Sequence, residues 1–315
     1  MHVDSLVQLV GITKRYAGVV ANDSVDFDLH PGEIHSILGE NGAGKTTLMK
    51  ILAGACLPDS GSIRINDQPV RIRSPRDSLK LGIGMVYQHF TLVPNLSAIE
   101  NLILGYEDGF FLNLKTARAK LQEICDAYGL SIDPDREIRD LSVSDRQRTE
   151  ILKILFRDSD VLILDEPTSM LSPAEAERLF QTLRLLRATG KAVVLITHNL
   201  REALAASDRI TIMRSGKKTA ELSKEDLAAQ DSQAASQMIL ASMFGAAPVS
   251  GIEMEGGKTS GGKPVLEFKQ VEALDGRGRI GLKRISMSIA MGEICGIAGV
   301  DGESRRLLAD RKSVV

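Results

Sequence analysis

This sequence lacks the long apolar runs that cross membranes. No window of its 315 residues approaches the roughly 18 consecutive apolar positions that a bilayer-spanning helix needs. The first residues include Asp4 and no uninterrupted apolar segment, so we expect no secretory signal. Any role at a membrane is therefore expected to depend on a partner protein.

An excess of charge of one sign is also missing, because 39 basic side chains are matched by 41 acidic ones. This balance provides no overall field that would attract nucleic acid or an anionic membrane, and we expect no nucleic-acid partner. Cysteine is scarce as well. Cys56, Cys125 and Cys295 are far apart and show neither a CxxC pair nor a metal-ligand spacing, which is typical of reduced thiols in a cytoplasmic protein.

What the sequence does contain is a glycine-rich octapeptide, GENGAGKT, between an apolar run and a helix-like stretch. Glycines let backbone N–H groups turn toward an anion, and the N-terminus of the following helix adds partial positive charge. Lys45 would reach the β- and γ-phosphates of a nucleotide, and Thr46 would hold Mg²⁺. A chance glycine-rich turn is the alternative, and the strand–loop–helix context disfavours it. The predicted nucleotide-binding residues are Gly39, Glu40, Asn41, Gly42, Ala43, Gly44, Lys45, Thr46 and Thr47.

The pattern around this loop is that of an α/β domain. Residues 6–12 and 25–29 alternate apolar with polar positions, which indicates half-buried antiparallel strands at the start. Buried strands are expected at 33–38, 83–87, 160–164 and 192–197, and helices at 46–53, 174–188 and 200–206. Strands that alternate with helices predict a largely parallel sheet. Between about residues 92 and 153 the pattern is helical, clearest at Leu114–Tyr128 and Gln147–Phe156, and indicates a helical insertion.

A second copy of the N-terminal pattern begins near residue 264. The segment GEICGIAGVDG at 292–302 matches GEIHSILGENG at 32–42, and the alternation at 285–289 matches that at 25–29, both 260 positions later. We therefore predict a first domain at 1–245, a Gly- and Ser-rich linker at 246–263, and the N-terminal fragment of a second domain at 264–309. Residues 310–315 match the translation of a common sequencing adapter, so we expect a non-native tail; a natural short tail is the alternative.

A carboxylate pair complements the phosphate loop. Asp165 and Glu166 end the apolar run VLIL, where Asp165 would take Mg²⁺ through water and Glu166 would polarise an attacking water. A strand that simply ends in solvated acids is the alternative for an isolated pair of this kind. The phosphate loop upstream favours the catalytic interpretation.

With these motifs the chain resembles the ATPase subunits of ABC transporters. The resemblance rests on the segment DEPTS from Asp165, the segment LSVSD from Leu141, Gln88 and His198, and it covers residues 5–245 and, more weakly, 264–309. It implies an α/β fold: a P-loop NTPase (RecA-like) core with an N-terminal antiparallel β subdomain and an inserted helical subdomain. The closer resemblance is to importers of simple sugars and nucleosides, and residues 84–96 look more like the nucleoside branch.

The resemblance also implies roles for single residues. Tyr16 would stack on adenine, Gln88 would sense Mg²⁺ and the γ-phosphate, and His198 would contact the γ-phosphate. Ser142 would contact the nucleotide of a facing domain in trans. Taken singly, Tyr16 could be a packing aromatic, Gln88 a loop amide and His198 a capping side chain; their order and spacing favour the functional roles.

Departures from the family pattern are informative. Ser144 replaces a glycine of the signature, Arg146 replaces a neutral glutamine, and Ser172 replaces an aspartate that many relatives carry. The repeated loop at 299–306 lacks the Gly-Lys-Thr ending. Because such domains work head to tail, we predict one competent composite site, formed by residues 39–46 with Glu166, and one degenerate site.

We expect an ATP- and Mg²⁺-dependent ATPase that energises an importer of nucleosides or simple sugars from the cytoplasmic face of the membrane. Its partners would be transmembrane permease subunits, an extracytoplasmic solute-binding protein acting indirectly, and a second ABC domain. A soluble ABC-type ATPase acting on ribosomes or DNA and a non-catalytic nucleotide-binding regulator are the alternatives. Co-purification with multi-span membrane proteins would distinguish the importer subunit from the soluble ATPase. ATP turnover by the full-length protein would distinguish it from the non-catalytic regulator.

Overall fold

The computed structural model describes residues 5–105, 114–223, 225–226, 232–245, 264–274, 280–293, 295–297 and 308. They fall into two units, Met1–Val249 and Ser250–Val315. The segments predicted as the linker (246–263) and the tail (310–315), and the whole repeated loop at 299–306, lie outside the described residues.

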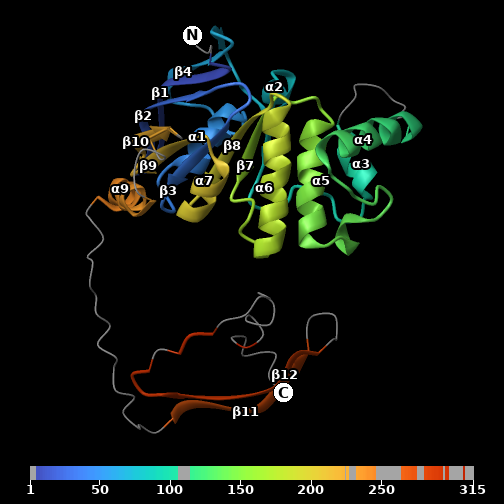
Figure 1. The fold of residues 1–315 in the computed structure, drawn as a ribbon, viewed down its shortest axis with the longest axis vertical. Coiled ribbons are helices and arrows are strands. Elements are labelled where there is room, and N and C mark those ends of the chain that lie inside the picture. The colour runs from blue at the N-terminus through green and yellow to red at the C-terminus, as the bar shows by residue number, and fades with distance from the viewer. Residues whose placement is uncertain are drawn as a thin grey trace. The chain divides into compact units, whose positions relative to one another are not determined.

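A six-stranded sheet forms the centre of the first unit, in the order β10-β9-β3-β8-β7-β6 (Figure 1). All neighbours run parallel except β10, which is antiparallel to β9. The four predicted buried strands are confirmed, whereas β9 and β10 were not anticipated. Their tight turn is made by Ser215 and Gly216, both at positive φ. The strands are β3 (Ile34–Gly39), β6 (Ile83–Val86), β7 (Val161–Asp165), β8 (Ala192–Thr197), β9 (Arg209–Arg214) and β10 (Lys217–Ser223).

Both faces of this sheet are covered, which is why its strands are almost continuously apolar in sequence. Along β7 and β8, Ile163 and Val194 pack on the side of helix α1 (Lys45–Leu52). The alternate residues Leu162 and Leu195 pack on the opposite side, against α5 (Val143–Leu155) and α6 (Pro173–Ala188). The two clusters hold the strand ends in fixed positions relative to the helices.

A second, antiparallel sheet packs against the other side of α1. It has the strand order β2-β1-β4-β5, and its apolar residues share one core cluster with α1 and the central sheet. The antiparallel strands predicted near the start are confirmed and are longer than expected. The hairpin β4–β5 was missed, although Asn66 and Asp67 at positive φ form its turn. These strands are β1 (Val7–Tyr16), β2 (Val19–Leu29), β4 (Ser60–Ile65) and β5 (Gln68–Val70).

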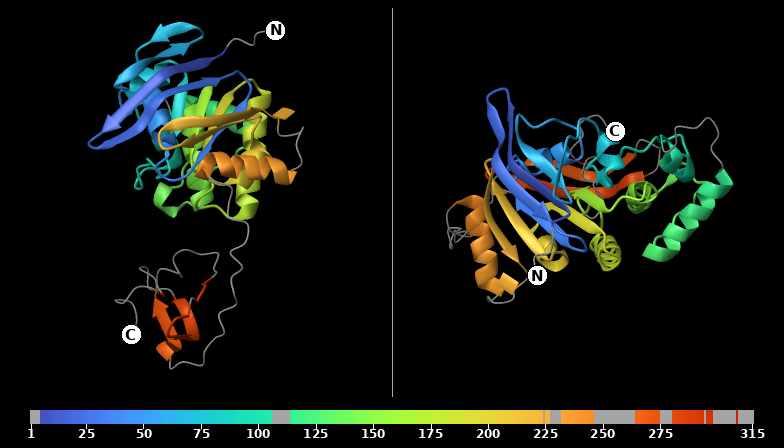
Figure 2. Two further views of the ribbon diagram at one scale, coloured as in Figure 1. Left: turned by 90° about the vertical axis from the view of Figure 1, so that its left-hand side faces the viewer. Right: turned by 90° about the horizontal axis from the view of Figure 1, so that it is seen from above.

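The predicted helical insertion lies at the opposite end of this unit from the β1–β2 hairpin (Figures 1 and 2). Helix α5 begins at Val143 rather than at the predicted Gln147, because Ser142 caps it by accepting the N–H of Asp145 at 3.1 Å. No helix in the described part of the chain combines the length and apolar character needed to span a bilayer. The remaining helices are α2 (Pro75–Lys80), α3 (Ala98–Ile103), α4 (Leu114–Tyr128), α7 (Leu200–Ala206) and α9 (Ser232–Phe244).

The second unit contains an antiparallel hairpin, β11 (Pro264–Leu274) with β12 (Ile280–Ala290), that repeats the register of β1 with β2. Leu9 faces Phe27 in the first hairpin, and Phe268 faces Met287 in the second. Both hairpins then shift register at a bulge. The bulge residue bonds to the opposite strand in each: the N–H of Gly11 to Asp26 at 2.7 Å, and that of Gln270 to Ser286 at 2.9 Å.

A cluster of polar side chains joins β2 of the antiparallel sheet to the neighbouring strands β3 and β9 of the central sheet. His35 is fully buried, and its Nε2 lies 2.9 Å from Thr211 Oγ1. Arg209 donates from both Nη1 and Nη2 to Asp28 Oδ2, each at 2.9 Å. Burial raises the pKa of Asp28, but hydrogen bonding and the charge of Arg209 outweigh burial and leave that pKa below its ordinary value.

The free energy of unfolding should therefore decrease in acid, in part because Asp28 becomes protonated. A carboxyl whose pKa is depressed on folding stabilises the fold above its unfolded pKa of about 3.9, and this stabilisation is lost as pH falls through the folded pKa. Asp28→Asn should lower the free energy of unfolding at pH 7 by about 1 kcal/mol, since the pair is partly exposed, and flatten its decline in acid. Urea titrations between pH 7 and pH 3 measure this. The exposed Asp140→Asn is the matched control, and identical acid profiles for both variants would contradict the assignment.

Candidate functional site

The loop between β3 and α1 requires glycine at two positions for steric reasons. A Cβ added to Gly39 would lie 2.3 Å from the carbonyl oxygen of Met213, and one added to Gly44 would lie 2.1 Å from that of Ala21. Gly44 also adopts φ +98° as the N-cap of α1. The loop is thus pressed against β2 and β9, and its shape is fixed by backbone that any side chain would displace.

Lys45 lies over this loop and is 5% exposed. Its Nζ donates to the carbonyl oxygens of Gly39 at 2.7 Å and Glu40 at 2.9 Å. Burial lowers its pKa, although the charges of Glu166 and Asp165 act in the opposite direction. Phosphate oxygens are stronger acceptors than peptide carbonyls, so the ammonium can exchange these partners for a phosphate.

Two side-chain oxygens that could bind a metal ion lie next to each other near Lys45. Thr46 Oγ1 donates to Asp165 Oδ1 at 3.0 Å, joining the first turn of α1 to the end of β7. Asp165 is 4% exposed, and burial raises its pKa despite the hydrogen bond from Thr46. A buried carboxylate and a hydroxyl next to a phosphate loop are a ligand set that suits Mg²⁺, which takes oxygen ligands from one or two side chains together with phosphates.

Glu166 is the point where the other predicted residues converge. Gln88 Nε2 donates to its Oε2 at 3.1 Å, and His198 Nδ1 lies 3.0 Å from its Oε1. Glu166 itself has φ +47°, an uncommon conformation for a residue with a side chain. The ends of β6, β7 and β8 therefore bring Gln88, Glu166 and His198 together, although 110 positions separate the first from the last in sequence.

Two predicted residues stay apart from this cluster. Tyr16, at the end of β1, is 50% exposed and has the Lys14 ammonium 5.5 Å from its ring centroid. Among the described residues no hydrogen bond or ring contact joins it to the phosphate loop. Among the residues that the structure describes, the side chain of Ser142 bonds only within its own turn, donating to Asp145 Oδ2 at 2.7 Å. Its predicted role is in trans, so contacts within one chain do not test it.

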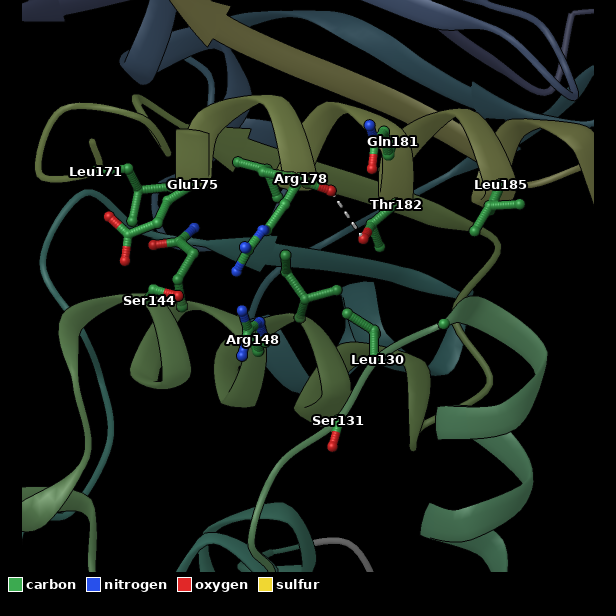
Figure 3. Close-up of a pocket in the computed structure, with 14 residues that line it drawn as sticks. Leu130, Ser131, Ser144, Arg148, Leu171, Glu175, Arg178, Gln181, Thr182 and Leu185 are labelled. Atoms are coloured by element: carbon green, nitrogen blue, oxygen red, sulfur yellow. Dashed lines mark hydrogen bonds between the residues drawn. The ribbon is translucent and has the colours of Figure 1, made fainter. Parts of the chain in front are cut away.

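The signature departures take up partners inside the domain. Ser144 is buried and lines a cavity of about 280 Å³ between α5 and α6, where Glu175 lies opposite and Arg148 and Arg178 point toward one another (Figure 3). The pKa of Glu175 is lowered by hydrogen bonds from Ser172 and also by one from Ser144. Position 144 has no positive φ, so its backbone does not require glycine. The substituted serine thus connects the signature helix to α6.

Two supporting residues were not anticipated from the sequence. Asn22 is fully buried, and its Nδ2 donates to the carbonyl of Gly44 at 3.2 Å, which holds the phosphate loop from β2. Glu150 on α5 is 3% exposed and accepts both the N–H and the hydroxyl of Thr91, three residues beyond Gln88. Neither carries a local sequence signal, because each partner lies 22 or more positions away.

The chain is similar to known proteins. Residues 22–169 match the family model described as ABC transporter. The nucleoside import ATP-binding protein NupA of Lactococcus lactis subsp. cremoris (strain MG1363) is 43% identical over 304 residues, which cover 96% of this chain and 58% of NupA. The guanosine import ATP-binding protein NupO of Bacillus subtilis (strain 168) is 41% identical, with 98% of this chain and 59% of NupO covered. The chain thus spans less than two thirds of the length of these relatives.

A solved structure agrees with the fold. The dimeric structure of a bacterial ABC transporter cassette superimposes with a TM-score of 0.61 at 26% identity, covering 69% of this chain and 98% of that cassette. The same cassette is known in a post-hydrolysis dimer bound to ADP and Pi. The expected P-loop core with its antiparallel subdomain is confirmed by this likeness and by the sheet order.

Lys45→Ala should abolish measurable binding of ATP, because it removes the side-chain cation that lies over the loop. Isothermal titration calorimetry with Mg·ATP measures this on the 315-residue chain. Lys217→Ala, which removes an exposed lysine of β10, is the matched control and should bind like the parent. Unchanged affinity of Lys45→Ala would refute the assignment of the phosphate loop.

Proposed function

Since this chain carries the ATP-binding domain of the ABC transporter family, we propose that it binds and hydrolyses ATP to energise an importer of nucleosides. The observation that carries the proposal is the environment of Glu166. One carboxylate at the end of β7 meets Gln88 and His198, and it adjoins the buried pair of Lys45 and Asp165. That arrangement suits a general base facing the γ-phosphate of a bound nucleotide.

Each residue then has a part in the reaction. Lys45 neutralises charge on the β- and γ-phosphates. Thr46 and Asp165 would hold Mg²⁺, which would supply further positive charge at the transferred phosphoryl group. Glu166 accepts the proton of the attacking water. Gln88 and His198, which bond to Glu166 in this structure, turn to the water and the γ-phosphate. Tyr16, exposed at the end of β1, stacks on adenine.

We further propose that the complete site includes a second ABC domain. Ser142 at the N-terminus of α5 contacts the nucleotide of that domain in trans, and the hairpin β11–β12 with its repeated register belongs to its beginning. Ser144 lines a cavity opposite Glu175 and Arg146 donates to the carbonyls of Ile138 and Arg139, so this signature offers a poor surface to the facing loop. The site of residues 39–46 is then competent and the other degenerate.

The relatives support our proposal for the transported class and the location. NupA, named for nucleoside import, and NupO, named for guanosine import, are 43% and 41% identical over almost the whole chain, against 37% for a glucose import protein of Haloferax volcanii (strain ATCC 29605). A ribose import protein of Burkholderia thailandensis (strain ATCC 700388) is 45% identical over a shorter stretch of 217 residues. We assign this chain to the nucleoside group. It acts at the cytoplasmic face of the membrane with permease subunits, and a solute-binding protein takes part indirectly from outside.

A groove beside Gln88 is the proposed docking place for the permease. It encloses about 160 Å³ between the core and α5, and it is lined by Leu79, Tyr87, Thr91 and Glu150. Tyr87 and Thr91 flank Gln88 in sequence, and Glu150 ties Thr91 to α5. A short permease helix in this groove would therefore press on the segment that carries Gln88, which couples membrane movement to the nucleotide site.

Glu166→Gln should keep ATP bound and lower the single-turnover rate at least about 100-fold, because an amide of the same shape cannot accept the proton. Calorimetry for binding and release of labelled phosphate for turnover separate the two effects. Glu177→Gln, on the exposed face of α6, is the control. Hydrolysis at the parental rate in Glu166→Gln would exclude this residue as the base.

Leu79→Glu should remove co-purification of the tagged chain with multi-span membrane proteins and leave ATP affinity unchanged, because a charge placed in the groove must be desolvated on docking. Leu57→Glu, at an exposed position on the antiparallel subdomain, is the control. Tagged protein is isolated from detergent-solubilised membranes of the host. If Leu79→Glu retained its membrane partners as well as Leu57→Glu does, the groove would not be the docking place.

A further inference from the structure

Glu202 collects donors from two loops of the nucleotide site. It lies in the first turn of α7, and its Oε2 accepts the hydroxyls of Thr168 at 2.7 Å and Thr197 at 3.1 Å. Its Oε1 accepts Asn199 Nδ2 at 3.0 Å. Thr168 follows β7, whereas Thr197 ends β8 and Asn199 follows it. One carboxylate therefore links the two segments that carry Glu166 and His198.

The three donors to Glu202 are close in sequence to Glu166 and His198. Thr168 is two positions after Glu166, and Thr197 and Asn199 immediately flank His198. A carboxylate is acceptor-only with about four lone-pair positions, so it can satisfy all three donors at once. A glutamine offers one carbonyl oxygen and adds an N–H₂ group that would face a donor. The chemistry of the position thus favours glutamate.

Helix capping does not explain this arrangement. In α3 and α6 the glutamate at the same helical position, Glu100 or Glu175, bonds back to the N–H of its own N-cap serine. In α7 the N-cap is Asn199, which accepts the N–H of Arg201. Glu202 instead extends to Thr168 and Thr197, which are outside the helix.

The linked segments need such support. Glu166 at φ +47° lies in the left-handed region, which is unfavourable for a residue with a side chain and persists only where neighbours hold it. Its N–H bonds to the carbonyl of Ile196 at 3.0 Å on one side, and the Glu202–Thr168 contact holds the chain on the other. The His198 side chain is 55% exposed, so the residues that flank it define where its ring starts.

We propose that Glu202 is the positioning residue that fixes Glu166 and His198 relative to one another for ATP hydrolysis. This inference rests on the proposed function, because it concerns the geometry of the same site. Glu202 does not touch nucleotide and acts through Thr168, Thr197 and Asn199. Its loss leaves the phosphate loop intact, so ATP binding persists while the general base and the histidine lose their alignment.

The test compares the parent with Glu202→Ala, Glu202→Gln, Thr168→Val and the double variant Glu202→Ala/Thr168→Val, with Glu177→Gln as the control. Single-turnover hydrolysis, ATP affinity by calorimetry and thermal unfolding are measured on the 315-residue chain. Glu202→Ala should lower the rate about 10- to 100-fold, as misplacement of a reacting group does, with affinity within twofold of the parent. Thr168→Val should lower it less, and the double variant should be no slower than Glu202→Ala.

A parental rate in Glu202→Ala and Glu202→Gln would overturn the proposal, and so would a loss of ATP affinity in parallel with the rate. If Glu202→Ala failed to fold, Glu202→Gln would decide by the same two measurements, since it keeps the shape and one acceptor. Lys45→Ala and Glu166→Gln are run beside these variants. If they too bound and hydrolysed ATP normally, the proposed function would fail; if they behaved as expected, only the positioning role would be lost.

Discussion

Strand β8 lies between β3 and β7, and all three run in one direction, so their carboxyl ends open onto a single edge of the sheet. The phosphate loop follows β3, Asp165 and Glu166 end β7, and His198 follows β8. Ligands of open parallel sheets bind at this edge because the loops and helix N-termini point there. Burial of both sheet faces keeps the three strands in register, and the positions of the phosphate loop, Glu166 and His198 relative to one another follow from that register.

The same geometry sets the balance of charge at the site. Lys45 and Asp165 are both almost completely buried. Removing a charge from water costs so much free energy that an isolated buried ion would become neutral instead. Burial lowers the pKa of Lys45 and raises that of Asp165, and so favours the neutral form of each. The negative charges of Asp165 and Glu166 limit the decrease for the lysine. The cluster thus keeps its charges close together, where a phosphate chain with its metal ion can exchange partners with little rearrangement.

Local sequence pattern was sufficient for four strands of the central sheet, β3, β6, β7 and β8, and for the phosphate loop, because these buried parallel strands are mostly apolar and the glycines are required sterically, whereas β9 and β10 were missed. The start of α5 was placed too late, since its first turn is polar and its signal is the cap at Ser142. Supporting contacts were beyond sequence reasoning. Asn22, Glu150 and Glu202 act through partners from other strands and loops, and the place of Ser144 opposite Glu175 depends on how two helices pack.

The repeated hairpins raise the question of how each first strand finds its own partner. The two share one register, so β1 could pair with β12 and β11 with β2 while the chain folds, an exchange to which repeated domains are prone. Side-chain volume opposes it. Leu9 faces Phe27 in one hairpin and Phe268 faces Met287 in the other, so each correct pair holds one aromatic ring. A mixed pair would hold either no ring or two, leaving a void or a clash where the native pairs are matched.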